Sequence, residues 1–233
     1  MDLLNWLMGA QAKRISSCGS LHYFKESNAP AGSTARCADC PVEGRCRFSA
    51  YKSYLPAAGD WPAAVITSSS DPNVLRKELD HSPYGRCVYR CDNDVCDQQV
   101  VAVEYEGGQT ASFNMSAFTN RMTRTIHVMC EDGEIFGDDG LHEIEVLSFS
   151  SNQVEGYQSE MIHVSEPRSG HGGGDSGIVD DFISLLQNGG RPARSEIGMS
   201  VDSHVMAGAA EMSRLTGQTI DLDSYRRQLG KEK

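Results

Sequence analysis

The sequence lacks the features that mark several common classes of protein. No apolar run approaches the roughly 20 residues needed to span a bilayer, so no membrane-spanning segment is expected. Basic residues are in deficit, because 21 Lys and Arg stand against 32 Asp and Glu, which gives a formal charge of −11. Such a charge opposes binding to nucleic acid or to an anionic membrane, and neither is expected as a partner.

A secretory signal is not evident either. Leu3–Met8 is apolar and Ala10–Ala12 is rich in small residues, but the apolar part is short and Asp2 stands where a signal peptide carries Lys or Arg. The expected location is therefore the cytoplasm. Its reducing conditions favour thiolates or bound metal over disulfides.

Cysteine, in contrast, is abundant, and five of the eight cysteines form two groups. Cys37, Cys40 and Cys46 give a C-x2-C-x5-C pattern in a loop, and Cys87 and Cys91 follow later. Three thiolates on one short loop need one more soft ligand to complete a tetrahedral zinc site or to hold an iron–sulfur cluster. Buried free thiols and disulfides are the alternatives. The remaining cysteines lie singly in predicted strands and are interpreted as core thiols: Cys18, Cys96 and Cys130.

The hydrophobic pattern of the first third predicts short helices around an irregular loop. Residues 3–8 follow a helical period that Gly9 can end, and 12–24 is typical of a strand that becomes irregular. A loop rich in Pro, Ala and Gly follows at 28–44. Short helices are predicted at 47–55 and at 71–79, the second capped by Asp71.

From about residue 87 to 164 the alternation of apolar and polar residues predicts β-strands. Gly107-Gly108 and Asp132-Gly133 mark tight hairpin turns. A row of hairpins makes an antiparallel, meander-like sheet, with helices expected on one face and the other face free for a partner. The predicted strands cover 99–105, 111–117, 125–130, 134–136, 141–149 and 158–164.

The last third is predicted to be helical. Apolar stripes run over 178–186 and 201–215, and the second is capped by Ser200 and stopped by Gly217. The small residues of the second stripe would let that helix lie close to a sheet. Only the charged tail after Tyr225 is expected to be loose. A single α+β domain is expected over residues 1–233, interrupted by a Cys-rich loop at about 28–46.

A glycine motif near residue 172 matches the dinucleotide-binding fingerprint. Gly172, Gly174 and Gly177 have the required spacing, but no parallel strand pair is predicted around them, and the fingerprint works only inside such a unit. We interpret the glycines as an approach to a helix N-terminus. His171 and Asp175 flank that start and are candidate contacts for an anionic or hydroxylated ligand, with simple capping as the alternative.

A second group of polar residues is predicted at a strand start. Tyr89, Arg90, Asp92, Asn93 and Asp94 supply mixed donors and acceptors, which sugar or polyol hydroxyls require, and Arg90 could pair with a carboxylate. These residues are candidates for substrate binding. The alternative is an ordinary polar loop or strand edge.

Eight segments spread along nearly the whole chain form a recognisable series: Asp2–Gly9, Arg14–Ser17, Gly19–Leu21, Pro83–Tyr89, Asp92–Asp94, Thr110–Phe113, Gly170–Asp175 and Ser203–Gly217. In this order they resemble the second half of Gfo/Idh/MocA-type oxidoreductases. The resemblance implies a domain like the C-terminal domain of glyceraldehyde-3-phosphate dehydrogenase, with a large, open, mostly antiparallel sheet and helices covering one face. It also implies that the free face of the sheet packs against another copy in a homodimer or homotetramer.

The same resemblance implies an NAD(P)-dependent enzyme that acts on a sugar, polyol or related hydroxy compound. In such enzymes a Rossmann domain binds NAD or NADP, and that domain and the catalytic His would lie before residue 1. We therefore expect no catalytic residue in this chain, and no turnover by the chain alone. One alternative is a non-catalytic, metal-stabilised dimerisation or binding module, and another is an unrelated binding protein built on an antiparallel sheet.

The resemblance bears on the cysteines as well. Relatives with the Arg-Cys-x-x-Cys-Pro-Val segment also carry the later cysteine pair, which implies that the two groups meet in space. Cys87 or Cys91 would then be the fourth ligand. Both could not serve, because four residues along a strand would separate them by roughly 13 Å. Four thiolates leave no open position, so the role of the metal would be structural.

Overall fold

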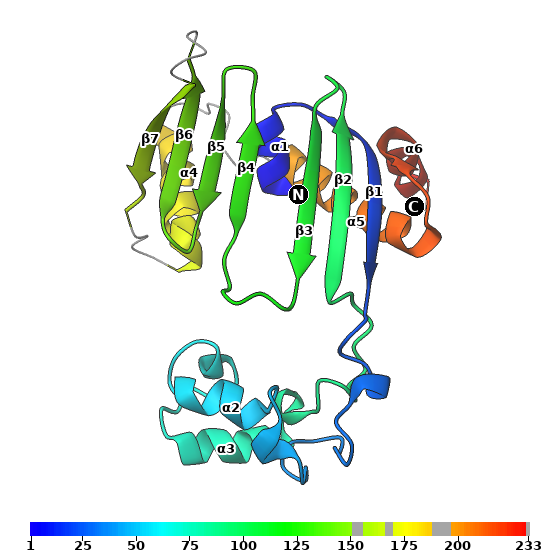
Figure 1. Ribbon diagram of the computed structural model, residues 1–233, viewed down its shortest axis with the longest axis vertical. Helices are drawn as coiled ribbons and strands as arrows, with labels where there is room; N and C mark the ends of the chain where they lie inside the picture. Colours follow the sequence, from blue (N-terminus) through cyan, green and yellow to red (C-terminus); the bar gives the residue numbers. More distant parts are fainter. Residues whose placement is uncertain (151–155, 166–169, 188–196, 232–233) are drawn as a thin grey trace. The chain divides into compact units, whose positions relative to one another are not determined.

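The structure, a computed structural model, describes residues 1–150, 156–165, 170–187 and 197–231 (Figure 1). The chain forms two compact units, one made of Met1–Leu7 with Phe118–Val205 and the other of Met8–Ala117 with Met206–Lys233. Each unit contains a four-stranded sheet whose neighbouring strands pair antiparallel. Among the described helices, none combines the length and the apolar character needed to cross a membrane.

The sheet of the second unit is built on two long central strands. β1 and β2 pair from Arg14 opposite Glu104 to Ser20 opposite Gln98. Helix α5 lies against this sheet, because the hydroxyl of its buried Ser213 accepts a hydrogen bond from the N–H of Ser17 in β1, at 2.8 Å. The predicted close approach of this helix to a sheet is confirmed. The elements are β1 (Ala12–Ser20), β2 (Gln98–Tyr105), β3 (Thr110–Ser116), β8 (Ile220–Asp221), α6 (Leu222–Leu229) and the part of α5 (Ile197–Thr216) that begins at Met206, with strand order β3-β2-β1-β8.

The core of this unit comes from the inward face of those strands and from the helices. Ile15, Val101 and Tyr105 are almost completely buried, and so are Met206 and Leu222 from the helical segments. Full burial of each such side chain stabilises the fold by about 1.5–3 kcal/mol.

The sheet of the first unit has two chemically different faces. Strand register places Ile126, Ile135, Ile144 and Ile162 on one face, which we call the apolar face. The opposite face, which we call the mixed face, combines apolar and charged side chains and includes His127, Met129, Glu134, Phe136, Glu143, Glu145, Phe149, Tyr157, Met161 and His163. The elements are α1 (Asp2–Met8), β4 (Thr125–Met129), β5 (Gly133–Asp138), β6 (Glu143–Phe149), β7 (Tyr157–His163) and α4 (Gly174–Gln187), with strand order β4-β5-β6-β7.

Residues 21–97, between β1 and β2, form a lobe with its own core, which we call the inserted lobe. It contains α2 (Ala50–Tyr54), α3 (Pro72–His81) and several 3-10 turns (Figure 1). Asp71 caps α3 as predicted, because its carboxylate accepts the N–H of Asn73 at 2.8 Å. The core of the lobe consists of Ala50, Tyr51, Ala63, Leu75 and Leu79.

The predicted α+β class and the antiparallel hairpins are confirmed, but several local predictions are wrong. Residues 88–90 form a turn and 91–97 are irregular, and β2 begins only at Gln98, so Cys87 and Cys91 do not lie along a strand. Helix α5 begins at Ile197, which removes the capping role predicted for Ser200. The tail after Tyr225 is not loose, because its residues as far as Leu229 belong to α6. Asp221 caps the start of this helix by accepting the N–H of Ser224 at 2.9 Å.

A buried carboxylate joins the two ends of the inserted lobe. Asp97 is only 4% exposed and accepts the backbone N–H groups of His22, Tyr23 and Phe24 at 3.0, 2.7 and 3.1 Å. Burial alone would raise the pKa of Asp97, but the three N–H donors outweigh it and hold the pKa below its ordinary value. Asp97 therefore fixes the chain leaving β1 to the chain entering β2.

We expect Asp97→Asn to lower the free energy of unfolding by about 2–3 kcal/mol, because a charged acceptor of buried N–H groups is lost. The wild-type contribution is present above the unfolded pKa of about 3.9 and is lost as the pH falls toward the lower folded pKa. Urea unfolding followed by circular dichroism between pH 3 and 7 measures both effects. The exposed Asp39→Asn is the control, and equal stability of the two variants at pH 7 would contradict the anchor role.

Candidate functional site

The five candidate substrate residues near position 90 lie in the inserted lobe, and several are engaged inside it. Tyr89 is 5% exposed and packs among Tyr23, Phe24 and Phe48, with ring centroids 5.7–6.0 Å apart. Burial, followed by the hydrogen bond with Tyr23, raises the pKa of Tyr89 well above its ordinary value. This side chain is part of an aromatic wall of the lobe and presents little surface to a ligand.

The charged members of this set also have partners within the lobe. Arg90 pairs with Glu26, and Asp92 accepts a hydrogen bond from Arg86 at 2.7 Å, which lowers the pKa of Asp92. Asn93 and Asp94 are exposed. The set therefore lies on the surface of an irregular segment, and Asp92, Asn93 and Asp94 are all exposed there.

His171 and Asp175 lie in the other unit and are brought together. Nδ1 of His171 is 2.9 Å from the carboxylate of Asp175, and both side chains are well exposed. His171 and Gly172 adopt positive φ values of 53° and 67° in a 3-10 turn that leads into α4. The preceding strand, β7, pairs antiparallel with β6, so this turn does not have the parallel-strand setting that a dinucleotide fingerprint requires.

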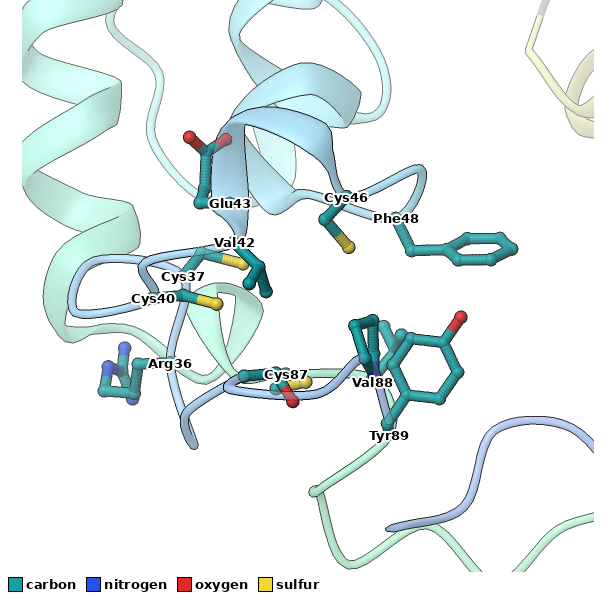
Figure 2. A pocket seen from close by; sticks show the side chains of 12 residues that line it. Arg36, Cys37, Cys40, Val42, Glu43, Cys46, Phe48, Cys87, Val88 and Tyr89 are labelled. Atoms are coloured by element: carbon teal, nitrogen blue, oxygen red, sulfur yellow. The ribbon is translucent and has the colours of Figure 1, made fainter. Parts of the chain in front are cut away.

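Four of the five predicted metal-ligand cysteines line one cavity of the inserted lobe. Figure 2 shows the side chains of Cys37, Cys40, Cys46 and Cys87 directed toward this space, which is partly open to solvent. Cys91 does not line it, and its sulfur lies 3.5 Å from the carbonyl oxygen of Val88. Other walls of the cavity come from Val42, Phe48, Val88 and Tyr89.

A short antiparallel ladder holds the two cysteine segments side by side. Arg36 and Arg86 form a β-bridge, flanked by hydrogen bonds from the N–H of Cys37 to the carbonyl of Gly85 (3.0 Å) and from the N–H of Cys87 to the carbonyl of Ala35 (2.9 Å). The register thus puts Cys37 and Cys87 on the same face of the ladder.

The Arg36 side chain ties this ladder to α3. Its guanidinium donates to the backbone carbonyls of Asp80, Leu79 and Ser82 at 2.9, 3.2 and 2.6 Å. These carbonyls belong to the last turn of the helix and the residue after it. Arg36 therefore supplies a donor to the helix-end carbonyls of Leu79 and Asp80, while the carbonyl of Ser82 also accepts the N–H of Gly85 at 3.2 Å.

The thiols of the cavity have different pKa values. Burial, together with the nearby Cys87, Cys46 and Cys40, raises the pKa of Cys37 despite the N–H of Ala50 at 3.4 Å from its sulfur. For Cys40 burial also favours the neutral thiol, but hydrogen bonds from the backbone of Thr34 and Val42 outweigh it and lower the pKa.

As the side chains stand, no group of three or more His, Cys, Asp or Glu residues in the described ranges is arranged to hold a metal ion. The predicted zinc ion or iron–sulfur cluster is therefore not supported by a ready-made coordination site. All eight cysteines are described, and none forms a disulfide. The interpretation of three of them as core thiols is wrong, since Cys18 and Cys130 are exposed and Cys96 is partly exposed, and neither Cys96 nor Cys130 lies in a strand.

Sequence reasoning missed two residues that shape this site. Arg36 and Asp97 act through backbone groups that are distant in the sequence, and a single charged residue in a loop gives no local signal of such contacts. Their positions, directly before Cys37 and directly before β2, were the available hints.

We expect Gly85→Ala to destabilise the chain by about 2–3 kcal/mol, because overpacking against a fixed backbone is costly. A Cβ at Gly85 would lie 1.8 Å from the carbonyl oxygen of Leu79, so the ladder beside Cys37 would have to shift. Thermal unfolding measures the loss. Gly44→Ala is the matched control, since nothing lies within 4 Å of its Cβ, and unchanged stability of Gly85→Ala would contradict the close approach.

Comparisons with known proteins show which proteins this chain resembles. No family profile matches the chain. It is 23% identical over 192 residues to YteT of Bacillus subtilis (strain 168), which carries a provisional oxidoreductase name; the match covers 78% of this chain and 44% of YteT. The chain thus spans less than half the length of this relative.

Solved structures give the same answer about the fold. An oxidoreductase domain protein from Kribbella flavida matches with a TM-score of 0.55 at 16% identity, covering 95% of this chain and 48% of that one. Levoglucosan dehydrogenase in complex with NADH and levoglucosan gives a TM-score of 0.52 at 13% identity, covering 95% and 47%. The relatives and neighbours are Gfo/Idh/MocA-type oxidoreductases, so the resemblance seen in the sequence is confirmed, and the chain has the fold of one part of such proteins.

Proposed function

We propose that this chain is the substrate-binding and subunit-contact domain of an NAD(P)-dependent oxidoreductase that acts on a CH–OH group of a sugar, polyol or related compound. The observation that carries the proposal is the fold match over 95% of the chain to levoglucosan dehydrogenase, a structure solved with NADH and a sugar derivative. The relationship to YteT supports the same reaction class.

The described residues do not fit a dinucleotide. Among the described residues the strands pair antiparallel, and the glycine turn at residue 172 follows one of these pairs. NAD or NADP would therefore be held by residues outside those described, and no catalytic step is assigned to this chain. Its contribution would be to bind and orient the hydroxylated substrate.

Two clusters, one in each unit, are separate candidates for contact with the substrate. Asn93 and Asp94, with Arg90 beside them, present hydrogen-bond donors and acceptors on the lobe surface, and Tyr89 would support them from the aromatic wall. His171 and Asp175 offer a paired donor and acceptor at the start of α4. Sugar hydroxyls act as both donor and acceptor, which is the chemistry these side chains match.

A domain exchange tests this function. We expect a chimera in which this chain replaces the matching part of YteT to reduce NAD or NADP with at least one member of a panel of sugars, anhydrosugars and polyols. Arg90→Gln or Asp94→Asn should raise KM for that substrate about tenfold, through loss of a charged hydrogen bond, without changing KM for the nucleotide.

Lys77→Gln and Asp39→Asn are the matched controls, because they remove the same charges from exposed positions elsewhere on the lobe. A folded chimera that binds nucleotide but oxidises no panel member would contradict the proposal. Tight one-to-one binding of NAD by the 233-residue chain alone, measured by calorimetry, would also contradict it.

We further propose that the mixed face of the β4–β7 sheet packs against a second copy of the chain. Phe149 and Tyr157 are directly paired across β6 and β7 and are 48% and 59% exposed, and Met129 on the same face is 73% exposed. The contact between Nε2 of His127 and the carboxylate of Glu134 (2.9 Å) lies on this face as well and would give such an interface polar specificity.

Tyr157→Glu places a charge within this surface and should shift a dimer or tetramer toward monomer in sedimentation experiments. Val74→Glu puts the same charge on the exposed face of α3 and should leave the assembly unchanged. A wild-type chain that is monomeric at micromolar concentration would contradict the interface.

A further inference from the structure

We propose that Cys37, Cys40, Cys46 and Cys87 bind one zinc ion as a closed, structural tetrathiolate site in the inserted lobe. The four side chains point into the same cavity from two separate chain segments (Figure 2). Soft thiolate ligands in a set of four are typical of structural zinc. This inference is independent of the proposed oxidoreductase function, because a closed site stabilises a fold and performs no turnover.

Backbone hydrogen bonds bring the two segments together without help from the thiols. The ladder around the Arg36–Arg86 bridge makes Cys37 and Cys87 diagonal neighbours on one face. Diagonal neighbours in an antiparallel pair have Cα atoms about 7–8 Å apart, with their Cβ atoms somewhat closer. Two sulfur atoms on one tetrahedral ion are about 3.8 Å apart, given Zn–S bonds of about 2.3 Å, so this pair is well placed to share an ion.

Consecutive turns bring the other two thiols to the same cavity. The N–H of Cys40 donates to the carbonyl of Cys37 at 3.2 Å, that of Glu43 donates to Cys40 at 3.1 Å, and that of Cys46 donates to Glu43 at 2.9 Å. The chain therefore curls around the cavity from Cys37 to Cys46. The N–H of Ala50, 3.4 Å from the Cys37 sulfur, supplies the kind of donor that stabilises a metal-bound thiolate.

The fourth ligand is Cys87 and not Cys91. The Arg90 N–H donates to the carbonyl of Cys87 at 3.0 Å and closes a turn that carries Cys91 away, with its sulfur near the carbonyl of Val88. The sequence left both residues as candidates for the fourth ligand, and the register of the ladder favours Cys87.

We assign one zinc ion, because a closed set of four thiolates is the ligand set typical of structural zinc. An iron–sulfur cluster also takes four thiolates and is distinguished by the metal analysis below. The thiols are not arranged for coordination as they stand. Each sulfur turns about one torsion, χ1, so a shared ion can draw together side chains that already face one space.

The test is metal analysis of the full chain purified under reducing conditions with zinc supplied. We expect about one zinc per chain, which is lost in Cys37→Ser and Cys87→Ser and retained in Cys91→Ser and Cys130→Ser. Chelation should lower the melting temperature of the wild type but not that of Cys87→Ser. Replacement of zinc by cobalt in the wild-type chain should give the intense sulfur-to-cobalt absorption and the visible bands of a tetrahedral thiolate site.

The cobalt spectrum keeps the proposal testable if the serine variants fail to fold. Absence of zinc together with eight freely reactive thiols in the wild type would overturn the proposal, and so would disulfides among these four cysteines under reducing conditions. Iron with acid-labile sulfide would overturn it in favour of a cluster. Zinc that survives Cys87→Ser and is lost in Cys91→Ser would overturn the ligand assignment.

Discussion

The fold of the second unit depends on how the two ends of a long insertion are held together, because the insertion lies between two strands that pair with each other. β1 and β2 are neighbours over their whole length, yet residues 21–97 separate them in the sequence. Loop-closure entropy grows only slowly with length, so a folded insertion is tolerated if its two ends are fixed together. The carboxylate of Asp97 provides this closure by binding three consecutive N–H groups beyond the end of β1.

The elements with strong local signals were predictable from the sequence. The alternation of Ala111, Phe113 and Met115 with polar neighbours, together with the Gly107-Gly108 turn, specifies the β2–β3 hairpin without long-range information. Asp71 followed by Pro72 likewise specifies the start of α3, because a side-chain cap and a fixed φ act within one turn. The antiparallel class follows from these short connections.

The candidate site was predictable only in part, because its geometry depends on register between distant segments. The cysteine spacing identified the loop, but the position of Cys87, and not Cys91, at the cavity follows from hydrogen bonds of residues 35–37 with 85–87. The polar run from Tyr89 to Asp94 indicated ligand contacts, yet Tyr89 is buried by aromatic residues from two other segments and Arg90 pairs with Glu26. A linear pattern shows which side chains are present, whereas their partners are set by tertiary contacts.

The thiol cavity and the anchor at Asp97 are parts of one continuous structure. Phe48 and Tyr89 line the cavity, and both rings pack against Tyr23 and Phe24, whose N–H groups bind Asp97. This aromatic wall therefore connects the thiol cavity to the residues that bind Asp97 through direct side-chain packing, so the cavity and the closure of the β1–β2 insertion share the same four rings.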